Sequence, residues 1–307
     1  MAPETQDLNL DISYKLSRLP DQWSFTPALV RERRRAGFGP FPLARKSDRA
    51  ETIQIFGSHG PIDLRLIRPA GPIAGVYLHI HGGGWTLGAS DYQDPMLEAI
   101  ADASGLAALS VEYRLAPENP YPKGPDDCEA AALWLIREGL ARIGGTKLAI
   151  GGESAGAHLS VVTCLRLRDK HGLTPFSAAN LISGCFDLGL TPSARHWGYE
   201  KLVLNTRDIE MFVRHFLLHG GDTRDPDISP IQADLTGMPP ALFSTGTRDP
   251  VLDDSLLMAM RWVSAGSPAE LAVYPGGCHV FQLFDFPMAH RSIDRCGAFL
   301  KAAIETE

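Results

Sequence analysis

Beyond residue 50 the chain alternates short apolar runs, rich in β-branched residues, with longer amphipathic stretches. This alternation is typical of a mostly parallel sheet with helices on both faces, because parallel strands need long crossover connections. We expect eight strands, near residues 51–56, 62–68, 75–81, 107–113, 147–152, 178–184, 240–246 and 269–274. We expect helices near residues 95–104, 125–138, 155–170, 253–265 and 286–304. The pattern therefore predicts an α/β fold built on one eight-stranded, mostly parallel sheet.

Two segments do not share this alternation. In residues 1–50 we expect one or two short helices followed by a Gly- and Pro-rich connection. Residues 186–238 separate two strands and contain apolar residues at helical spacing from Ile209 to Leu217. A structureless loop of that length is unusual in a compact domain, so we expect an insertion with its own helices. We predict a core of residues 51–185 and 239–307, with residues 1–50 and 186–238 forming a cap over one edge.

Composition and charge exclude several classes of partner and location. The formal net charge is −7, and no basic tract is long enough to follow a phosphate backbone, so we expect no nucleic-acid partner. We interpret the arginines at positions 31 and 33–35 as a solvated helix face. The five cysteines show no C-x-x-C spacing, which indicates a reducing compartment and no structural zinc. We see no signal-peptide pattern and no long apolar run, so we expect a cytoplasmic protein without a membrane span.

A serine lies where a predicted strand meets a predicted helix. Ser154 is the centre of the sequence Gly-Glu-Ser-Ala-Gly at 152–156. Small residues two positions to either side permit a sharp turn that exposes the hydroxyl, and the following helix N-terminus offers amides to negative charge. The motif is short, and a helix N-cap serine is the alternative. Its position between strand and helix favours a nucleophile.

Three consecutive glycines follow another predicted strand, in the sequence His-Gly-Gly-Gly-Trp at 81–85. Glycine amides are unshielded, so two of them can approach a substrate carbonyl and stabilise the oxyanion that forms. A flexible loop or a phosphate-binding loop is the alternative, but no G-K-[ST] follows and the chain contains no G-x-G-x-x-G. We expect the amide of Ala155, directly after the serine, to be a third donor.

A serine nucleophile needs a histidine base and an acid that orients it. His279 lies just beyond the last predicted strand, and Asp249 lies just beyond the strand before it. A helix N-cap is the alternative for Asp249, because a proline follows it. Asp253 and Asp254 fall inside the next predicted helix, where acidic side chains favour the helix dipole. We therefore predict a triad of Ser154, Asp249 and His279.

Together these motifs resemble the hormone-sensitive-lipase-like branch of the α/β-hydrolases. The resemblance rests on segments 81–85 and 152–156, Tyr-Arg-Leu-Ala-Pro-Glu at 113–118, Asp-Pro-Val at 249–251 and Cys-His-Val-Phe at 278–281. It implies the α/β-hydrolase fold with a helical cap, and carboxylester hydrolysis through an acyl-serine intermediate without cofactor or metal. It assigns oxyanion binding to Gly83 and Gly84, and structural roles to Arg114 and Glu118. Glu153 departs from the family, in which many members have Asp.

Further aromatic, histidine and cysteine side chains lie near the predicted site in the sequence or beside its motifs. We expect six aromatic side chains to form pocket walls, with a place in the core as the alternative for each: Trp85, Trp197, Tyr199, Phe212, Phe216 and Phe281. His79 and His81 form an H-x-H pair without a nearby carboxylate or cysteine to complete a metal site, so no metal is expected. We interpret Cys278 as a packing residue.

The predicted reaction is the hydrolysis of small esters with short or medium acyl groups. An amidase or formamidase with the same triad is the alternative. A ligand-binding receptor on this fold is a further alternative, which the presence of His279 disfavours. The resemblance also allows a homodimer, which nothing in the sequence decides.

Overall fold

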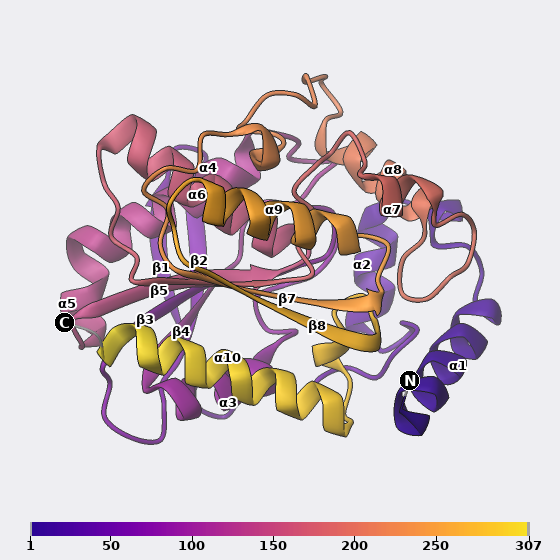
Figure 1. The fold of residues 1–307 in the computed structure, drawn as a ribbon, viewed down its shortest axis with the longest axis horizontal. Coiled ribbons are helices and arrows are strands. Elements are labelled where there is room, and N and C mark those ends of the chain that lie inside the picture. Colours follow the sequence, from indigo (N-terminus) through magenta and orange to yellow (C-terminus); the bar gives the residue numbers. More distant parts are fainter. Residues whose placement is uncertain (1, 306–307) are drawn as a thin grey trace.

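The computed structural model describes residues 2–305, and one eight-stranded sheet runs through them (Figure 1). The strands are β1 (Ala50–Gly57), β2 (Gly60–Ile67), β3 (Gly75–Ile80), β4 (Leu106–Val111), β5 (Lys147–Glu153), β6 (Ala178–Ile182), β7 (Ala241–Arg248) and β8 (Ala269–Cys278). Their order is β1-β2-β4-β3-β5-β6-β7-β8. The β1–β2 and β2–β4 pairs are antiparallel, and the remaining pairs are parallel. The prediction of an eight-stranded, mostly parallel sheet is confirmed.

Helices cover both faces of the sheet (Figure 1). One layer contains α3 (Asp94–Ser104) and α10 (Pro287–Glu305), and the other contains α4 (Lys123–Trp134), α6 (Ala155–His171) and α9 (Leu252–Ser264). A π-helical turn at Leu135–Gly139 leads from α4 into the short helix α5 (Leu140–Ile143). Every residue of β3 and β4 is buried, as expected for central strands with helices on both sides.

The last strand is longer than its sequence pattern predicts. We expect it to end near residue 274, because Pro275, Gly276 and Gly277 interrupt the β-branched pattern. In the structure β8 continues to Cys278, and a register irregularity between Gly246 and Arg248 keeps it paired with β7. The extension matters for function because it brings the next residue, a histidine, to the end of β7.

The two segments outside the alternation lie beyond the carboxyl ends of the strands, where the arrowheads of β7 and β8 point in Figure 1. The first contains α1 (Pro3–Ser17), a 3-10 helix at Gln22–Ser24 and α2 (Pro27–Arg35). The second contains α7 (Pro192–His196), α8 (Thr206–Phe216) and a 3-10 helix at Pro230–Gln232. The segments contact each other directly: the Trp23 ring meets Phe212 edge-on at 5.0 Å, and its indole N–H donates to Asp208 at 2.7 Å.

Among the helices of residues 2–305, none combines the length and the apolar character needed to cross a bilayer.

Candidate active site

Ser154 lies on a sharp turn between β5 and α6. Its backbone has φ 55° and ψ −120°, a conformation that L-residues rarely adopt. The turn is packed against β3: a Cβ added at Gly152 or Gly156 would lie 2.0 Å or 1.8 Å from the carbonyl oxygen of Ile80. Glycine is therefore required at both positions, as the motif predicts.

The structure brings the three predicted polar side chains into one hydrogen-bonded row. The Ser154 hydroxyl lies 2.9 Å from His279 Nε2, and His279 Nδ1 lies 2.9 Å and 3.1 Å from the two carboxylate oxygens of Asp249. Asp249 and His279 are buried, and Ser154 is half-buried. Asp249 also accepts a hydrogen bond from the amide of Val251 at 3.0 Å, which fixes the carboxylate. This arrangement can remove a proton from the serine and hold the resulting imidazolium.

The glycine loop after β3 lies beside this row, and its three amides differ in whether they have a hydrogen-bond acceptor. The Gly82 amide donates to Glu153 Oε1 at 2.6 Å. Within residues 2–305, no acceptor binds the amides of Gly83 or Gly84, and both glycines line the cavity in front of Ser154. Ala155 is the first residue of α6, so its amide has no intrahelical acceptor. Among residues 2–305, the three amides predicted to bind the oxyanion thus have no loop or intrahelical acceptor.

Glu153 has a role that sequence reasoning missed. Its second carboxylate oxygen lies 2.9 Å from His79 Nε2, while His79 Nδ1 lies 2.9 Å from the hydroxyl of Ser110. Glu153 therefore joins β5 to the glycine loop and to β3, directly beside the nucleophile position. The expectation that no carboxylate lies near the His79 and His81 pair is therefore wrong, because Glu153 contacts His79. The ring of His81 stacks on Tyr113 at 4.3 Å. The sequence signal for this role is the acidic residue directly before Ser154.

A second residue that sequence reasoning missed is His158, one helical turn after Ser154. It is fully buried; its Nε2 lies 2.8 Å from the carbonyl oxygen of Ile228, and its Nδ1 lies 3.1 Å from the indole nitrogen of Trp85. Burial lowers the pKa of His158 to about 4, so the ring is neutral near pH 7. Only the tautomer with its proton on Nε2 can donate to Ile228 and accept from Trp85.

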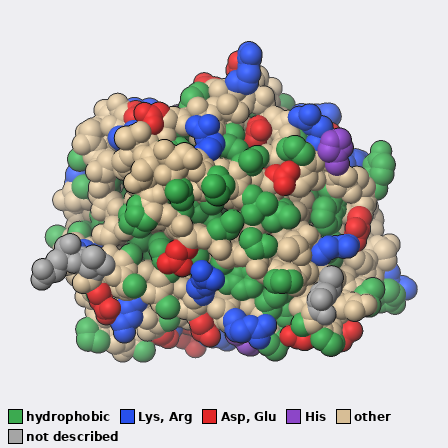
Figure 2. Space-filling view, viewed as in Figure 1, with side chains coloured by type: hydrophobic (Ala, Val, Ile, Leu, Met, Phe, Trp, Pro, Cys, Tyr) green, Lys and Arg blue, Asp and Glu red, His purple; other side chains and the backbone are tan. Residues whose placement is uncertain are grey.

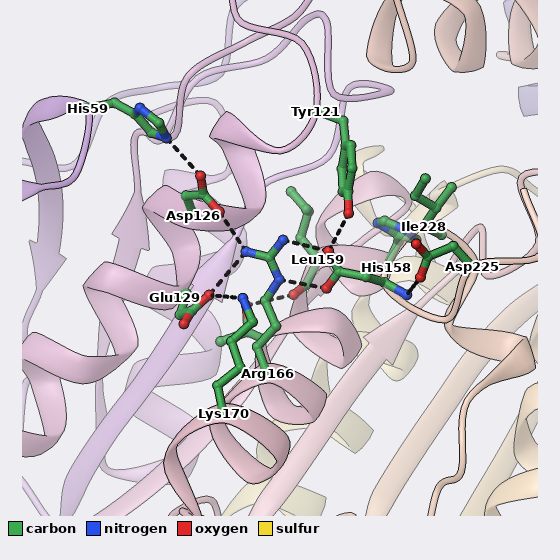
Figure 3. A network of polar contacts seen from close by, with 12 residues as sticks. His59, Tyr121, Asp126, Glu129, His158, Leu159, Arg166, Lys170, Asp225 and Ile228 are labelled. Carbon is green, nitrogen blue, oxygen red and sulfur yellow. Dashed lines mark hydrogen bonds and ion pairs between the residues drawn. The ribbon is translucent and has the colours of Figure 1, made fainter. Parts of the chain in front are cut away.

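A part-buried ion-pair network centred on Arg166, which lies on the same helix, fixes the loop that carries Ile228 (Figure 3). Arg166 contacts both oxygens of Asp227 at 2.6 Å, and it also contacts Asp126 at 2.8 Å and Glu129 at 3.1 Å. Tyr121 donates its hydroxyl to Asp227 at 2.6 Å. The network attaches the 186–238 segment, through Asp227, to α4 and α6.

A cavity of about 1450 Å³ lies in front of Ser154 and His279. Of the six aromatic side chains expected on its walls, Phe212 lines it, and the prediction is corrected for the other five. Trp85, Phe216 and Phe281 are buried in the hydrophobic core, where Trp85 stacks on Phe216 at 4.8 Å. Trp197 packs beside Arg248, and Tyr199 is 89% exposed; neither lines the cavity. Hydrophobicity predicts that such rings are covered, but not whether protein or substrate covers them.

The other predicted residues have structural contacts. Arg114 binds Asp127 and donates to the carbonyls of His59 and Pro61, which holds the start of β2. Cys278 is buried in a small apolar cluster, and burial raises the pKa of its thiol to about 12, as expected of a packing residue.

The arginine run at 31–35 is not simply a solvated face. Arg31 donates to the carbonyl oxygen of Thr86 at 2.9 Å and pairs with Glu118 at 2.7 Å, so it attaches α2 to the segment after the glycine loop.

Known proteins are similar to this chain in sequence and in fold. A family model described as the alpha/beta hydrolase fold matches residues 77–283. An acetyl-hydrolase of Streptomyces hygroscopicus is 33% identical over 242 residues, which cover 77% of this chain and 79% of that protein. A carboxylesterase of Mycobacterium tuberculosis is 34% identical over 241 residues, which cover 75% of this chain and 74% of that protein.

Solved structures agree with these relatives. An esterase of the archaeon Pyrobaculum calidifontis superposes with a TM-score of 0.89 at 28% identity, covering 99% of both chains. An esterase from the bacterial hormone-sensitive lipase family superposes with a TM-score of 0.84 at 30% identity, also covering 99% of both chains. The chain therefore belongs to the α/β-hydrolase family and, within it, to the hormone-sensitive-lipase-like esterases.

Proposed function

We propose that this enzyme hydrolyses small carboxylic esters with short or medium acyl groups, with Ser154 as nucleophile. The observation that carries the proposal is the row from Ser154 through His279 to Asp249, with hydrogen bonds of 2.9 Å at both links, at the wall of a cavity. The names of the relatives, an acetyl-hydrolase and a carboxylesterase, support an ester as substrate.

In the proposed reaction, His279 Nε2 takes the proton of Ser154 as the serine oxygen attacks the ester carbonyl. Asp249 accepts a hydrogen bond from the Nδ1–H group of His279, and its negative charge stabilises the imidazolium. The carbonyl oxygen becomes an oxyanion that the amides of Gly83, Gly84 and Ala155 can bind. His279 then returns its proton to the leaving alcohol. A water molecule cleaves the acyl-serine by the same route and regenerates the free enzyme.

We also propose that residues 1–50 and 186–238 form the cap over this site. Both segments contribute to the cavity wall, the first through Gln22 and Phe25 and the second through Phe212. They are joined at Asp208, which accepts hydrogen bonds from the side chain of Gln22 at 3.1 Å and from that of Trp23 at 2.7 Å. A cap built from two distant segments can adjust the cavity without disturbing the core that holds the triad.

The test is a panel of p-nitrophenyl esters from acetate to decanoate, measured beside the p-nitroanilides of the same acids. We expect Ser154→Ala to lower turnover of every ester by about a millionfold, the order of loss seen when such a serine is removed. Ser264→Ala, on the exposed end of α9, is the matched control and should retain full activity. Wild-type turnover in Ser154→Ala would refute the nucleophile, and anilide cleavage as fast as ester cleavage would indicate an amidase.

A further inference from the structure

The last turn of α2 carries three arginines that line the cavity in front of Ser154: Arg33, Arg34 and Arg35. Within residues 2–305 none of the three has a carboxylate partner at ion-pair distance. The guanidinium of Arg33 lies 5.0 Å from the ring centre of Phe25, and Arg34 donates to the Gln22 side-chain oxygen at 3.2 Å. Three cations thus lie on one cavity wall without a carboxylate partner from residues 2–305.

Other basic side chains on the cavity wall do have partners. Lys15 pairs with Asp11 at 2.7 Å, and Arg65 pairs with the buried Asp94 at 2.5 Å. Lys46 pairs with Asp91. On the face shown in Figure 2, acidic and basic side chains are also interspersed. The unpaired cations on α2 therefore form a local feature of a protein whose net charge is −7.

Arg34 is the most constrained member of this group. Burial lowers the pKa of its guanidinium, and the nearby Tyr92 and Asp208 partly offset this effect. Gln22 bridges Asp208 and Arg34: its side chain donates to Asp208 at 3.1 Å and accepts from Arg34 at 3.2 Å. By exposure Arg34 is half-buried, whereas Arg33 and Arg35 are exposed. A guanidinium partly withdrawn from water without a direct anion is less favourable than a paired one, and an anion that enters the cavity can offset that cost.

A short series of contacts connects Arg34 with the reacting centre. Phe212 lies against Gly84 in the glycine loop, the ring of Trp23 packs on Phe212 at 5.0 Å, and Gln22 precedes Trp23 in the chain. Gln22 in turn binds Arg34. The oxyanion donors and the α2 arginines therefore border the same cavity, and a substrate that contacts both must extend along it from Ser154 to α2.

We propose that the α2 side of the cavity is a subsite for a carboxylate of the substrate, with Arg34 as the specificity-determining residue and Arg33 and Arg35 as supporting charges. The enzyme then prefers esters that carry a second, free carboxylate at a distance from the scissile bond, such as half-esters of dicarboxylic acids. A planar guanidinium with free N–H groups matches a carboxylate in geometry as well as charge. This inference rests on the proposed esterase function and adds a substrate class to it.

The test compares matched anionic and neutral substrates. Two pairs are used, because the free carboxylate can lie on the acyl side or on the alcohol side of the ester. For the acyl side, mono-p-nitrophenyl adipate is compared with p-nitrophenyl heptanoate; for the alcohol side, 4-acetoxybenzoate is compared with its methyl ester. The quantity measured is the ratio of kcat/KM for the anionic substrate to kcat/KM for its neutral counterpart, after subtraction of the rate without enzyme.

We expect wild type to favour the anionic member of at least one pair, and Arg34→Met to lower that ratio about ten- to hundredfold, mainly through KM. This range corresponds to a hydrogen bond to a charged group. Arg34→Lys should retain part of the preference, because it keeps the charge without the forked geometry. Arg142→Met, an exposed arginine on α5, is the matched control and should leave the ratio unchanged. High salt should reduce the wild-type ratio.

Two results would overturn the subsite. The first is that wild type shows no preference for the anionic substrate in either pair. The second is that Arg34→Met and Arg34→Lys lower kcat/KM equally for the anionic and the neutral member of each pair. Failure of the esterase proposal is a distinct result, since it requires Ser154→Ala to retain activity on the neutral esters. The carboxylate subsite can therefore fail while ester hydrolysis stands.

Discussion

Replacing His158 with leucine should destabilise the protein and disturb the glycine loop, although His158 contacts neither the Ser154 hydroxyl nor its base. The imidazole is buried between two partners: it donates to the carbonyl of Ile228 at 2.8 Å and accepts from the indole N–H of Trp85 at 3.1 Å. Leucine fills a similar volume and makes neither bond. Trp85 directly follows Gly84, so a shift of the indole is transmitted to the oxyanion donors.

The magnitude follows from the two groups that lose their partner. A buried donor or acceptor left without a hydrogen bond costs about 1–3 kcal/mol, so the loss of both bonds should lower the free energy of unfolding by about 2–6 kcal/mol. The second variant, Trp85→Phe, removes the indole N–H itself. Trp85→Phe alone leaves His158 Nδ1 without its donor, whereas in the double variant only the carbonyl of Ile228 remains unsatisfied. The single losses therefore count three unsatisfied groups and the double variant one, so the two substitutions should cost about 2–6 kcal/mol less together than the sum of the single losses.

The assay is urea unfolding at pH 7 of wild type, both single variants and the double variant, with ester turnover measured on each. His219→Leu, on the exposed segment after α8, is the matched control and should change the free energy of unfolding by less than about 0.5 kcal/mol. Two results would show that His158 does not bridge Trp85 and Ile228. One is unfolding of His158→Leu at the wild-type urea concentration, and the other is a loss in the double variant that equals the sum of the two single losses within about 0.5 kcal/mol.

Three further changes test the site and its surroundings. Gly84→Ala would place a methyl group 2.3 Å from the Phe212 ring in a backbone with φ 59°, so we expect ester turnover to fall at least tenfold while circular dichroism stays unchanged; normal turnover would contradict a close-fitting loop. Asp249→Asn should lower kcat about ten-thousandfold, because an amide cannot hold the required tautomer of His279; a loss under tenfold would show that another acid orients the histidine. Burial raises the pKa of Asp254 to about 7, above its ordinary value of 3.8. Ionisation is therefore disfavoured in the folded state, and stability should decline as pH rises from about 4 to about 7. Asp254→Asn should flatten that decline in urea unfolding at pH 5 and pH 8, and an unchanged slope would exclude this group as its cause.

The order of strands and helices follows from local sequence patterns. Apolar runs of strand length and amphipathic stretches of helix length are properties of short windows, so eight strands could be expected without knowledge of any contact. The boundary at the end of β8 could not, because pairing with β7 overrides the Pro275-Gly276-Gly277 interruption. Such long-range pairing is not visible in a local pattern.

The triad residues could be nominated because the carboxyl ends of parallel strands meet at one edge of the sheet. Ser154, Asp249 and His279 each follow a predicted strand, so the topology alone places them near one another. The contacts of Glu153 with His79 and of His158 with Trp85 could not be predicted in this way. Those pairs depend on side-chain directions and on packing between helix, loop and strand.

The cavity wall depended still more on tertiary contacts. Trp85, Phe216 and Phe281 were expected to face the substrate, but they pack in the core, whereas the arginines of α2 line the cavity. By itself the alternating sequence determined the eight-stranded sheet and the edge at which the strand-end motifs gather, because periodicity and motif position are local. Only the tertiary structure decided which side chains face that edge, because burial and ion pairing depend on segments that are far apart in the chain.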